Sequence, residues 1–502
     1  MAEPPEEGRE PGGGGRLGEV LGARRTKAER LRARGVEPFA LSFDPTASLA
    51  ELHERFDALA AGEETGEVVS VAGRIVLLRS QGRLSFATIR DRSADLQLFL
   101  MQGEMGEGYG LLEDLDLGDI VGADGEVVKT RRGELSVKVG TLTLLTKALR
   151  PLPEKWHGLR DPEEQQRRRH LQLATDPSAR ELVLARAATL RALRAHLDGQ
   201  GFVEVETPVL QPVAGGALAR PFVTHHRALD LDLYLRISLE LYLKRLLVGG
   251  LERVYEIGRN FRNEGIDRDH NPEFTMLEAY QAYTDYEGMM RLSQALVTEA
   301  AMAVRGSLRF EFRGREMDLE PPWRRATLTE LVSEAVGEEV SLDRPDELRG
   351  LAEAHGIPLH PSWGPGKALA ELYEKLVEEH LLQPTFVCDF PREVSPLARP
   401  HRSRPGYTEH FDLIIAGMEI VPAYSELTDP DEQRARFEDQ LRHKAAGEEE
   451  VHPYDEDFVE ALEHGMPPAG GMGLGVDRLL IVLTGVASIR DLILYPHLRP
   501  EV

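Results

Sequence analysis

The segment from 254 to 280, VYEIGRNFRNEGIDRDHNPEFTMLEAY, constrains the fold of this chain more than any other part of the sequence. Side chains alternate along a strand, so a strand that runs to Glu264 points Arg262 and Glu264 the same way. After a polar turn, His270 and Phe274 return four residues apart, on one face of a second strand. A guanidinium can grip a phosphate through two hydrogen bonds, and an aromatic ring can stack on a purine. The pattern predicts a nucleotide-binding hairpin; the alternative is a surface hairpin with a chance ion pair.

A glycine-rich segment near the C-terminal end is a second candidate for nucleotide contact. Gly471, Gly473 and Gly475 precede Arg478 and the apolar run 479–483. Glycines let the backbone approach a ligand closely, and the start of a helix favours anions. The glycine spacing does not fit the dinucleotide pattern G-x-G-x-x-G, and the phosphate-loop pattern G-x-x-x-x-G-K-[ST] is absent from the sequence. The segment therefore predicts a phosphate contact by Arg478; the alternative is a glycine-rich helix junction without a ligand.

Two acids in the segment 410–420 (HFDLIIAGMEI) suggest a metal site. The segment is typical of a β-hairpin with a two-residue turn, which pairs Ile415 with Met418 and Ile414 with Glu419. Asp412 then lies on the same face as Glu419, within side-chain reach. Two such carboxylates form a hard-oxygen site suited to Mg²⁺ that carries substrate phosphates. The alternative is two independent solvent-facing acids.

The N-terminal third of the chain has a different pattern. About five short strands with turns between them occupy the stretch from 67 to 149, which predicts a small β-barrel, with the OB-fold as the leading candidate. Arg79, Arg83 and Phe86 on its strands could pair and stack single-stranded bases. Phe86 could equally be a core residue, and the pattern alone leaves that open.

The length of 502 residues exceeds what one hydrophobic core supports, so at least two domains are expected. The C-terminal part mixes helices and strands without strict alternation, which predicts an α+β fold. A basic helix near 24–34 is either a solvated arm or a contact for RNA. The expected organisation is a disordered tail at 1–22, a helical arm at 23–65, the barrel at 66–148, a linker at 149–176 and a large domain at 177–502 with a helical insertion at about 342–382.

Charge and cysteine content limit the class of protein. The formal net charge of −25 argues against a general nucleic-acid coat, although it leaves room for local basic faces. A single cysteine, Cys388, excludes an internal disulfide and a thiolate metal cage. The apolar runs fall far short of the ~20 residues that a membrane span needs. We therefore expect a soluble protein of the cytoplasm with no membrane partner.

Together these motifs resemble the class II aminoacyl-tRNA synthetases, and among them the lysine-specific members. The likeness runs from about residue 24 to residue 500. The first class II motif is similar to 201–208 (GFVEVETP), the second to 261–274 and the third to 471–478. Three further stretches are close to lysine-specific members: 215–222 (GGALARPF), 240–245 (ELYLKR) and 390–397 (FPREVSPL).

The resemblance implies a lysine–tRNA ligase reaction, in which ATP activates L-lysine to an adenylate before transfer to tRNA(Lys), with Mg²⁺ (about two or three ions) as cofactor. It implies an OB-fold anticodon-binding domain and a catalytic domain built on an antiparallel β-sheet with flanking helices. Arg262 and Arg478 would be the catalytic arginines, on the α- and γ-phosphates. The other implied ATP contacts are Glu264, His270, Asn271, Phe274 and Gly475.

The resemblance also implies roles for three further groups of residues and a homodimer. Asp412 and Glu419 would hold Mg²⁺, and Pro208 would lie in the homodimer interface. The implied lysine contacts are Gly216, Glu240, Glu278, Tyr280, Tyr424 and Glu426. The implied anticodon contacts are Arg79, Phe86, Gln97 and Glu134.

The sequence departs from the family pattern at three places. Pro422 stands where a small polar residue is usual, Leu239 replaces a proline, and Asp412 replaces the more frequent glutamate. Glu426 lies an odd number of residues after Glu419, so we expect a bend near Pro422 to turn both toward one site. Two alternative functions stay open: a related enzyme that attaches lysine to a protein, and a non-catalytic paralogue that binds RNA or senses an amino acid.

Overall fold

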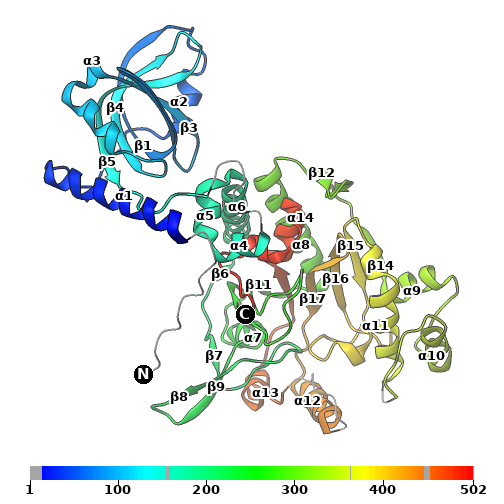
Figure 1. Ribbon diagram of the computed structural model, residues 1–502. Coiled ribbons are helices and arrows are strands. Elements are labelled where there is room, and N and C mark those ends of the chain that lie inside the picture. Colours follow the sequence, from blue (N-terminus) through cyan, green and yellow to red (C-terminus); the bar gives the residue numbers. More distant parts are fainter. Residues whose placement is uncertain (1–13, 154–158, 160, 362, 446–452, 501–502) are drawn as a thin grey trace. The chain divides into compact units, whose positions relative to one another are not determined.

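The computed structural model describes residues 14–153, 159, 161–361, 363–445 and 453–500. The chain forms two compact units, and each is considered by itself (Figure 1). The first contains the residues up to 161 together with 170–176, and the second contains 162–169 and everything from 177 onward. Within the described ranges, no helix has the length and apolar character needed to cross a membrane.

The first unit is a closed five-stranded barrel, as the sequence predicts. Its strand order is β1-β2-β3-β5-β4, with β3 and β5 parallel and the other pairs antiparallel. Alternation along the strands turns residues such as Val71, Ile89 and Leu98 into a buried core. The strands are β1 (Glu64–Gln81), β2 (Leu84–Arg90), β3 (Asp95–Met101), β4 (Ile120–Lys129) and β5 (Leu135–Thr146).

Short helices close the barrel. Helix α2 (Leu49–Phe56) begins at a capping box, in which Ser48 and Glu51 satisfy each other's backbone N–H groups. Helix α3 (Gln102–Met105) and the 3-10 helix η1 (Gly106–Asp114) connect β3 to β4. Two more helices, α4 (Pro162–Arg167) and α5 (Arg169–Thr175), occupy part of the segment that we expected to be a plain linker.

The N-terminal helix α1 (Gly14–Ala33) begins earlier than the sequence suggested. A tail up to residue 22 was predicted, but 14–22 are helical; 1–13 lie outside the described residues. Glycine has poor helix propensity, so the glycines before the basic segment did not predict that its helix extends toward the N-terminus. The basic residues are largely occupied: Arg30 and Arg34 pair with Asp114, and Arg24 donates to the carbonyl of Ala148. The arm is therefore docked on the barrel.

The second unit is built on an eight-stranded sheet of order β14-β15-β16-β17-β18-β11-β10-β6. All neighbouring pairs are antiparallel except β14–β15 and β10–β6, at the two ends of the sheet. This agrees with the predicted α+β class. The strands are β6 (Val203–Glu204), β10 (Arg253–Phe261), β11 (Glu273–Ala282), β14 (Arg324–Thr327), β15 (Thr385–Cys388), β16 (His410–Ile415), β17 (Met418–Ser425) and β18 (Ala469–Gly475).

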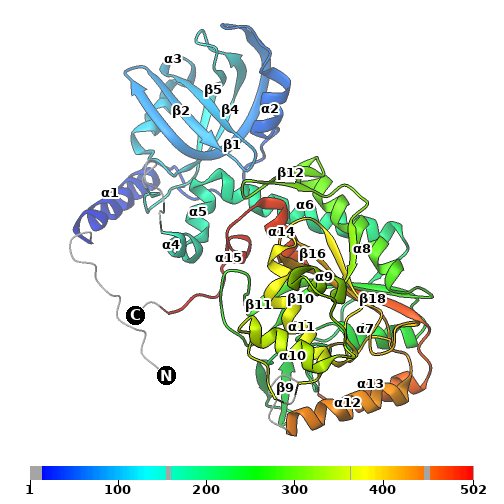
Figure 2. The ribbon, with the colours of Figure 1, turned by 90° about the vertical axis from the view of Figure 1, so that its right-hand side faces the viewer.

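Three helices pack on this sheet and on one another: α6 (Pro177–Gly199), α8 (Tyr286–Arg305) and α14 (Val476–Thr484). Helix α14 contacts α6, α8, β11 and β17, and its residues 479–483 are completely buried. Figure 2 shows α14 close to α6. A helix that is apolar on all sides belongs in such a core. Helix α14 therefore joins the main core of the unit to the glycine-rich strand β18, which ends at Gly475 just before Arg478.

The remaining elements surround the sheet. Helix α7 (Glu240–Val248) packs against β11 and α13 (Glu456–Glu463), and α13 also contacts α12 (Pro430–Ala445). The predicted insertion contains α10 (Pro345–Ala354), α11 (Pro365–Leu376) and η2 (Glu378–His380), and α10 and α11 share a core with α9 (Leu328–Val336). The other elements are β7 (Leu210–Gln211), β8 (Val223–His226), β9 (Leu231–Leu235), β12 (Arg309–Phe312), β13 (Arg315–Asp318), η3 (Arg392–Val394) and α15 (Ile489–Leu492).

Candidate active site

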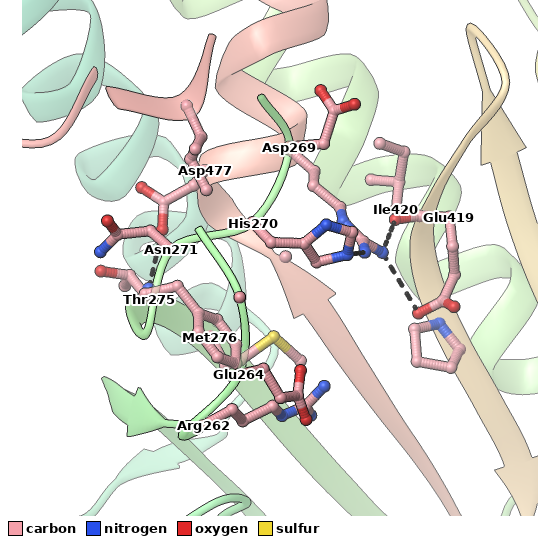
Figure 3. A pocket seen from close by; sticks show the side chains of 16 residues that line it. Arg262, Glu264, Asp269, His270, Asn271, Thr275, Met276, Glu419, Ile420 and Asp477 are labelled. Carbon is pink, nitrogen blue, oxygen red and sulfur yellow. Dashed lines mark hydrogen bonds and ion pairs between the residues drawn. The ribbon is translucent and has the colours of Figure 1, made fainter. Parts of the chain in front are cut away.

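A cavity of about 170 Å³ lies between the β10–β11 hairpin and the start of α14 (Figure 3). It brings together every residue that the resemblance implied for ATP, although these residues come from segments as far apart in the chain as Arg262 and Arg478. The predicted lining residues are Arg262, Glu264, His270, Asn271, Phe274, Gly475 and Arg478, and Glu419 joins them.

The hairpin differs from the predicted one at its tip. Strand β10 ends at Phe261 and β11 begins at Glu273, so Arg262, Glu264 and His270 lie in the connection and not on strands. The expectation of a strand to Glu264 was therefore wrong. The backbone N–H of Arg262 donates to the carbonyl of Pro272, and Asp267 accepts from two N–H groups of its own turn. This local turn closes the loop before the strand can continue.

Arg262 is positioned to receive an anion. Its guanidinium carbon lies 5.0 Å from the centre of the Phe274 ring, a cation–π contact. Its Nε is buried and has no hydrogen-bond partner among the described residues. Burial lowers the pKa of Arg262, with Glu419 opposing this effect, because a buried cation lacks solvent. A phosphate oxygen would supply the missing acceptor.

Arg478 faces the same cavity from the first turn of α14. Its Nη1 donates to the carbonyl of Glu419 at 3.0 Å and lies 3.7 Å from the carboxylate of that residue. Its Nη2 lies 3.4 Å from Nε2 of His270, whose Nδ1 contacts Asp267 at 2.9 Å. The two arginines form a positively charged wall beside His270, and this wall suits the phosphates of a nucleotide.

An ion pair that sequence reasoning missed holds this wall in place. Arg186 of α6 contacts Asp477 at 2.5 Å, and it also donates to the Thr275 hydroxyl at 2.7 Å. The second Asp477 oxygen accepts from the Thr275 backbone N–H at 2.7 Å. These contacts fasten the start of α14 to β11. The only sign of these contacts in the sequence is that Asp477 directly precedes Arg478.

Of the two predicted acids, Glu419 lines this cavity, whereas Asp412 lies near Glu419 but is not part of the lining. Ile415 pairs with Met418 and Ile414 with Glu419, as the sequence indicated. Burial raises the pKa of Glu419, and the nearby carboxylate of Asp412 adds to this. A third acid, Glu378 of η2, was missed; burial and the charges of Glu419 and Asp412 raise its pKa to about 7. Carboxylates that repel one another in this way suit a cation.

A bulge in β17 explains how acids with odd spacing share a face. Leu413 pairs with Val421 and Ile414 with Glu419, so Ile420 is the additional residue. Beyond it, Pro422 and Tyr424 line the site together with Glu419. The predicted bend near Pro422 is therefore a β-bulge two residues before the proline.

A second cavity of about 220 Å³ adjoins the first, since Arg262, Met276 and Pro422 line both. It contains five of the six residues implied for lysine. These are Gly216, Glu240, Glu278, Tyr280 and Tyr424. The sixth, Glu426, is buried behind this surface, and a Cβ at Gly471 would come within 2.1 Å of its Oε1. Glycine is required at 471 to leave room for that carboxylate.

Glu278 accepts three hydrogen bonds in this pocket. The donors are the Ser238 hydroxyl at 3.1 Å, the Leu239 backbone N–H at 3.0 Å and the Tyr280 hydroxyl at 3.0 Å. Burial and the charge of Glu240 nevertheless raise the pKa of Glu278 to about 7. The leucine at 239 makes the second of these hydrogen bonds possible, because the proline that is usual in the family has no N–H to donate.

The outer face of the barrel carries two of the predicted anticodon residues, Arg79 and Phe86, in one row. Arg79 pairs with Phe86, Phe86 with Phe99, and Phe99 with Lys138, across four strands. The rings of Phe86 and Phe99 stack at 5.3 Å and are half-buried, so Phe86 is not a core residue. Gln97 donates to the Ser136 hydroxyl nearby, and Glu134 is exposed in the turn before β5. Phe99 is an addition to the predicted set.

Pro208 lies in an exposed segment next to apolar side chains that have no cover within the described chain. The group occupies the first class II motif and the small sheet β7-β9-β8. Its exposed apolar members are Val203, Val209, Leu210, Val223 and Leu231. Exposed apolar side chains that are grouped in this way are typical of interaction surfaces.

Comparison with known proteins agrees with this geometry. Residues 161–499 match the tRNA synthetases class II (D, K and N), and residues 69–145 match the OB-fold nucleic acid binding domain. The chain belongs to the class II tRNA synthetases of this D, K and N group.

Within this class, proteins named lysine–tRNA ligase are similar to the chain over nearly its whole length. One from Moorella thermoacetica is 50% identical, covering 96% of this chain and 98% of its own. One from Syntrophomonas wolfei is 47% identical over 97% and 98%, and one from Thermosynechococcus vestitus is 50% identical over 96% and 97%.

Proposed function

We propose that this chain is a lysine–tRNA ligase, which joins L-lysine to tRNA(Lys) through a lysyl-adenylate and releases AMP and pyrophosphate. The observation that supports this most is the junction of the two cavities at Arg262. One side offers a guanidinium, an aromatic ring and a second arginine to a nucleotide. The other side offers buried glutamates to a cationic amino acid. No observation favours another acceptor or a non-catalytic role.

In the proposed mechanism, the carboxylate of lysine attacks the α-phosphorus of ATP in line, and the chain supplies no nucleophile. Arg262 holds the α-phosphate and stabilises the negative charge that develops there. Arg478 and His270 hold the far end of the triphosphate. Phe274 stacks on the adenine, while Glu264, Asn271 and the backbone at Gly475 contact the nucleoside. Orientation of the two substrates provides much of the rate enhancement.

We propose that the second cavity selects lysine by charge. Glu278, Tyr280 and Glu426 would receive the ε-ammonium, and Glu240 with the backbone of Gly216 would receive the α-amino group. Tyr424 would form the wall beside them. An ammonium group enters such a site only when carboxylates compensate for its lost hydration.

We propose Asp412 and Glu419 as the residues that hold Mg²⁺, with Glu378 as a third acid beside them. The oxygen chemistry fits, and the mutual repulsion of these acids favours a bound cation. Among the described residues, no three ligand side chains form a preformed metal centre, as expected where phosphates complete the coordination. When bound, Mg²⁺ would neutralise phosphate charge as pyrophosphate leaves.

We further propose that Arg79, Phe86, Gln97 and Glu134 read the anticodon on the barrel, and that Pro208 and its apolar neighbours join two copies of the chain. The function in translation and the lone buried cysteine support a cytoplasmic location.

ATP–pyrophosphate exchange with each of the twenty amino acids tests the proposal, with and without Mg²⁺. Exchange with lysine alone, dependent on Mg²⁺, is the expected result, and transfer to tRNA(Lys) should follow. Exchange with a different amino acid, or with none, would contradict the proposal.

A further inference from the structure

A lysine of the chain itself lies inside the charged wall of the amino-acid pocket. Lys244 of α7 is fully buried, and its Nζ lies 2.5 Å from an oxygen of Glu240 and 2.5 Å from an oxygen of Glu426. The ring of Phe458 covers it at 6.0 Å. Burial lowers the pKa of Lys244, but Glu240 and Glu426 more than offset this, so the pKa is raised. Lys244 is therefore a fixed internal cation.

The charges in this wall can be counted. Glu240, Glu278 and Glu426 are all buried there, and Lys244 neutralises one of the three. When all three glutamates are ionised, the wall carries two negative charges in excess; because burial raises the pKa of Glu278 to about 7 and that of Glu426 to about 8, this state is complete only above about pH 8. L-Lysine brings two ammonium groups, one on its α-carbon and one at the end of its side chain. Its carboxylate has a separate partner, since Arg262 lines both cavities.

We propose that Lys244 is a positioning residue that sets the charge of the amino-acid pocket, so that the pocket carries one negative charge for each ammonium group of the substrate. The proposal rests on the lysine–tRNA ligase function proposed above. Lys244 also fixes the positions of two carboxylates of the pocket. These are the carboxylate of Glu240, which lies next to Gly216, and that of Glu426.

The surroundings of Glu426 show why a neutral residue could not replace Lys244. Apart from its ion pair with Lys244, neither oxygen of Glu426 has a hydrogen-bond partner in the described chain. The other titratable groups near it are Glu240, Glu278, Tyr280 and Tyr424, and none of these brings a positive charge. Without Lys244, a buried and unpaired carboxylate would take up a proton.

The first experiment compares the wild type with Lys244→Met in lysine-dependent ATP–pyrophosphate exchange across pH 5.5 to 9. Loss of the internal cation raises the pKa of the glutamates, so the acid limb of kcat/KM for lysine should move up by about one unit or more. At pH 7 the KM for lysine should rise about tenfold, while the KM for ATP changes less than about twofold. An unchanged acid limb and an unchanged KM for lysine in the folded variant would overturn the proposal.

Lys147→Met is the matched control. Lys147 is another fully buried lysine held by two acids, at 2.5 Å from Asp116 and 2.7 Å from Asp119, but it lies in the barrel. The Lys147→Met substitution should lower the melting temperature without moving the pH profile of kcat/KM for lysine. A shift of the profile in this control equal to that in Lys244→Met would show a general stability effect and overturn the proposal.

A second pair of variants keeps the test decisive if Lys244→Met does not fold. Glu426→Gln alone leaves one negative charge in excess, whereas Glu426→Gln combined with Lys244→Met restores two. The double variant should bind lysine more tightly than Glu426→Gln, although it lacks one more native group. Weaker or equal binding by the double variant would overturn the charge-matching argument.

Failure of this inference differs from failure of the proposed function. If the wild type does not exchange with lysine, the lysine–tRNA ligase assignment itself is wrong. If the wild type exchanges and the variants behave alike, only the role of Lys244 is wrong.

Discussion

Glu278 shows how a single residue can make substrate binding depend on pH. Its carboxylate must be ionised to hold an ammonium group, but burial and Glu240 raise its pKa to about 7. The contribution of Glu278 to lysine binding is therefore present above this pH and is lost as the pH falls through it. The three donors on Glu278 oppose the loss but do not abolish it.

We predict that kcat/KM for lysine falls about tenfold for each pH unit below about 7, because one proton must leave the free enzyme. The measurement is pyrophosphate exchange at limiting lysine and saturating ATP. Glu278→Gln should remove this limb and weaken lysine binding much more than ATP binding. A limb centred near 4.5, the ordinary value for glutamate, would contradict the prediction.

The site residues that could be predicted from the sequence are those that belong to short, continuous motifs. Arg262 and Phe274 share one hairpin, and Arg478 adjoins the glycine run. Lys244 and Glu378 were missed because each becomes part of the site only through packing against a strand distant in sequence. Their burial, which makes them chemically important, leaves no signal in a single sequence.

At the scale of elements, the start of α14 serves the core and the nucleotide cavity at once. The Arg186–Asp477–Thr275 contacts join α6, α14 and β11 directly behind Arg478. Asp477 is almost fully buried, and breaking a buried ion pair leaves an uncompensated charge.

We predict that Asp477→Asn lowers the free energy of unfolding by about 3 kcal/mol and raises the KM for ATP more than the KM for lysine. Thermal or urea denaturation and exchange kinetics measure the two effects. Arg194→Gln breaks the exposed ion pair between Arg194 of α6 and Glu204 of β6. This substitution should lower the free energy of unfolding by less than about 1 kcal/mol. Equal losses of unfolding free energy in both variants would show that the burial of Asp477 does not add to the cost of breaking its ion pair.

The elements themselves were predicted better than their ends. The barrel strands and the β16–β17 turn follow from side-chain alternation, and the sequence indicated both. The end of β10 at Phe261 and the start of α1 at Gly14 did not follow, because hydrogen bonds to Pro272 and the docking of a basic helix decided them. The bulge at Ile420 was foreseen only as a bend, since a bulge depends on the register with its neighbour strand.

At the scale of the whole molecule, recognition of tRNA and activation of lysine are assigned to separate units. The Phe86–Phe99 pair belongs to the barrel, while both cavities belong to the second unit. Changes on the barrel face should therefore affect one half-reaction only.

We predict that Phe86→Ala combined with Phe99→Ala reduces kcat/KM for charging of tRNA(Lys) by about 30-fold or more, since each ring that stacks on a base contributes about 1–3 kcal/mol. Pyrophosphate exchange should stay within about twofold of wild type. Phe39→Ala, an exposed aromatic elsewhere in the same unit, is the control. A comparable loss of exchange would refute the separation of tasks.

The exposed apolar side chains near Pro208 lead to a prediction about assembly. Leu210→Asp combined with Val223→Asp should convert a two-chain particle to a single chain, because a charge in an apolar interface is costly. Light scattering coupled to gel filtration measures the mass. Leu184→Asp, at an exposed position on α6, should leave the mass unchanged. A wild-type chain that is already single would contradict the proposed dimer.

Cys388 has a practical consequence for experiments on this protein. It is the only cysteine in the sequence, it is buried in β15, and burial raises the pKa of its thiol to about 12. A thiol that stays protonated and covered reacts slowly with maleimides. A cysteine introduced at one exposed position of the barrel would thus accept a fluorophore almost without background, and the wild-type thiol could stay in place during labelling.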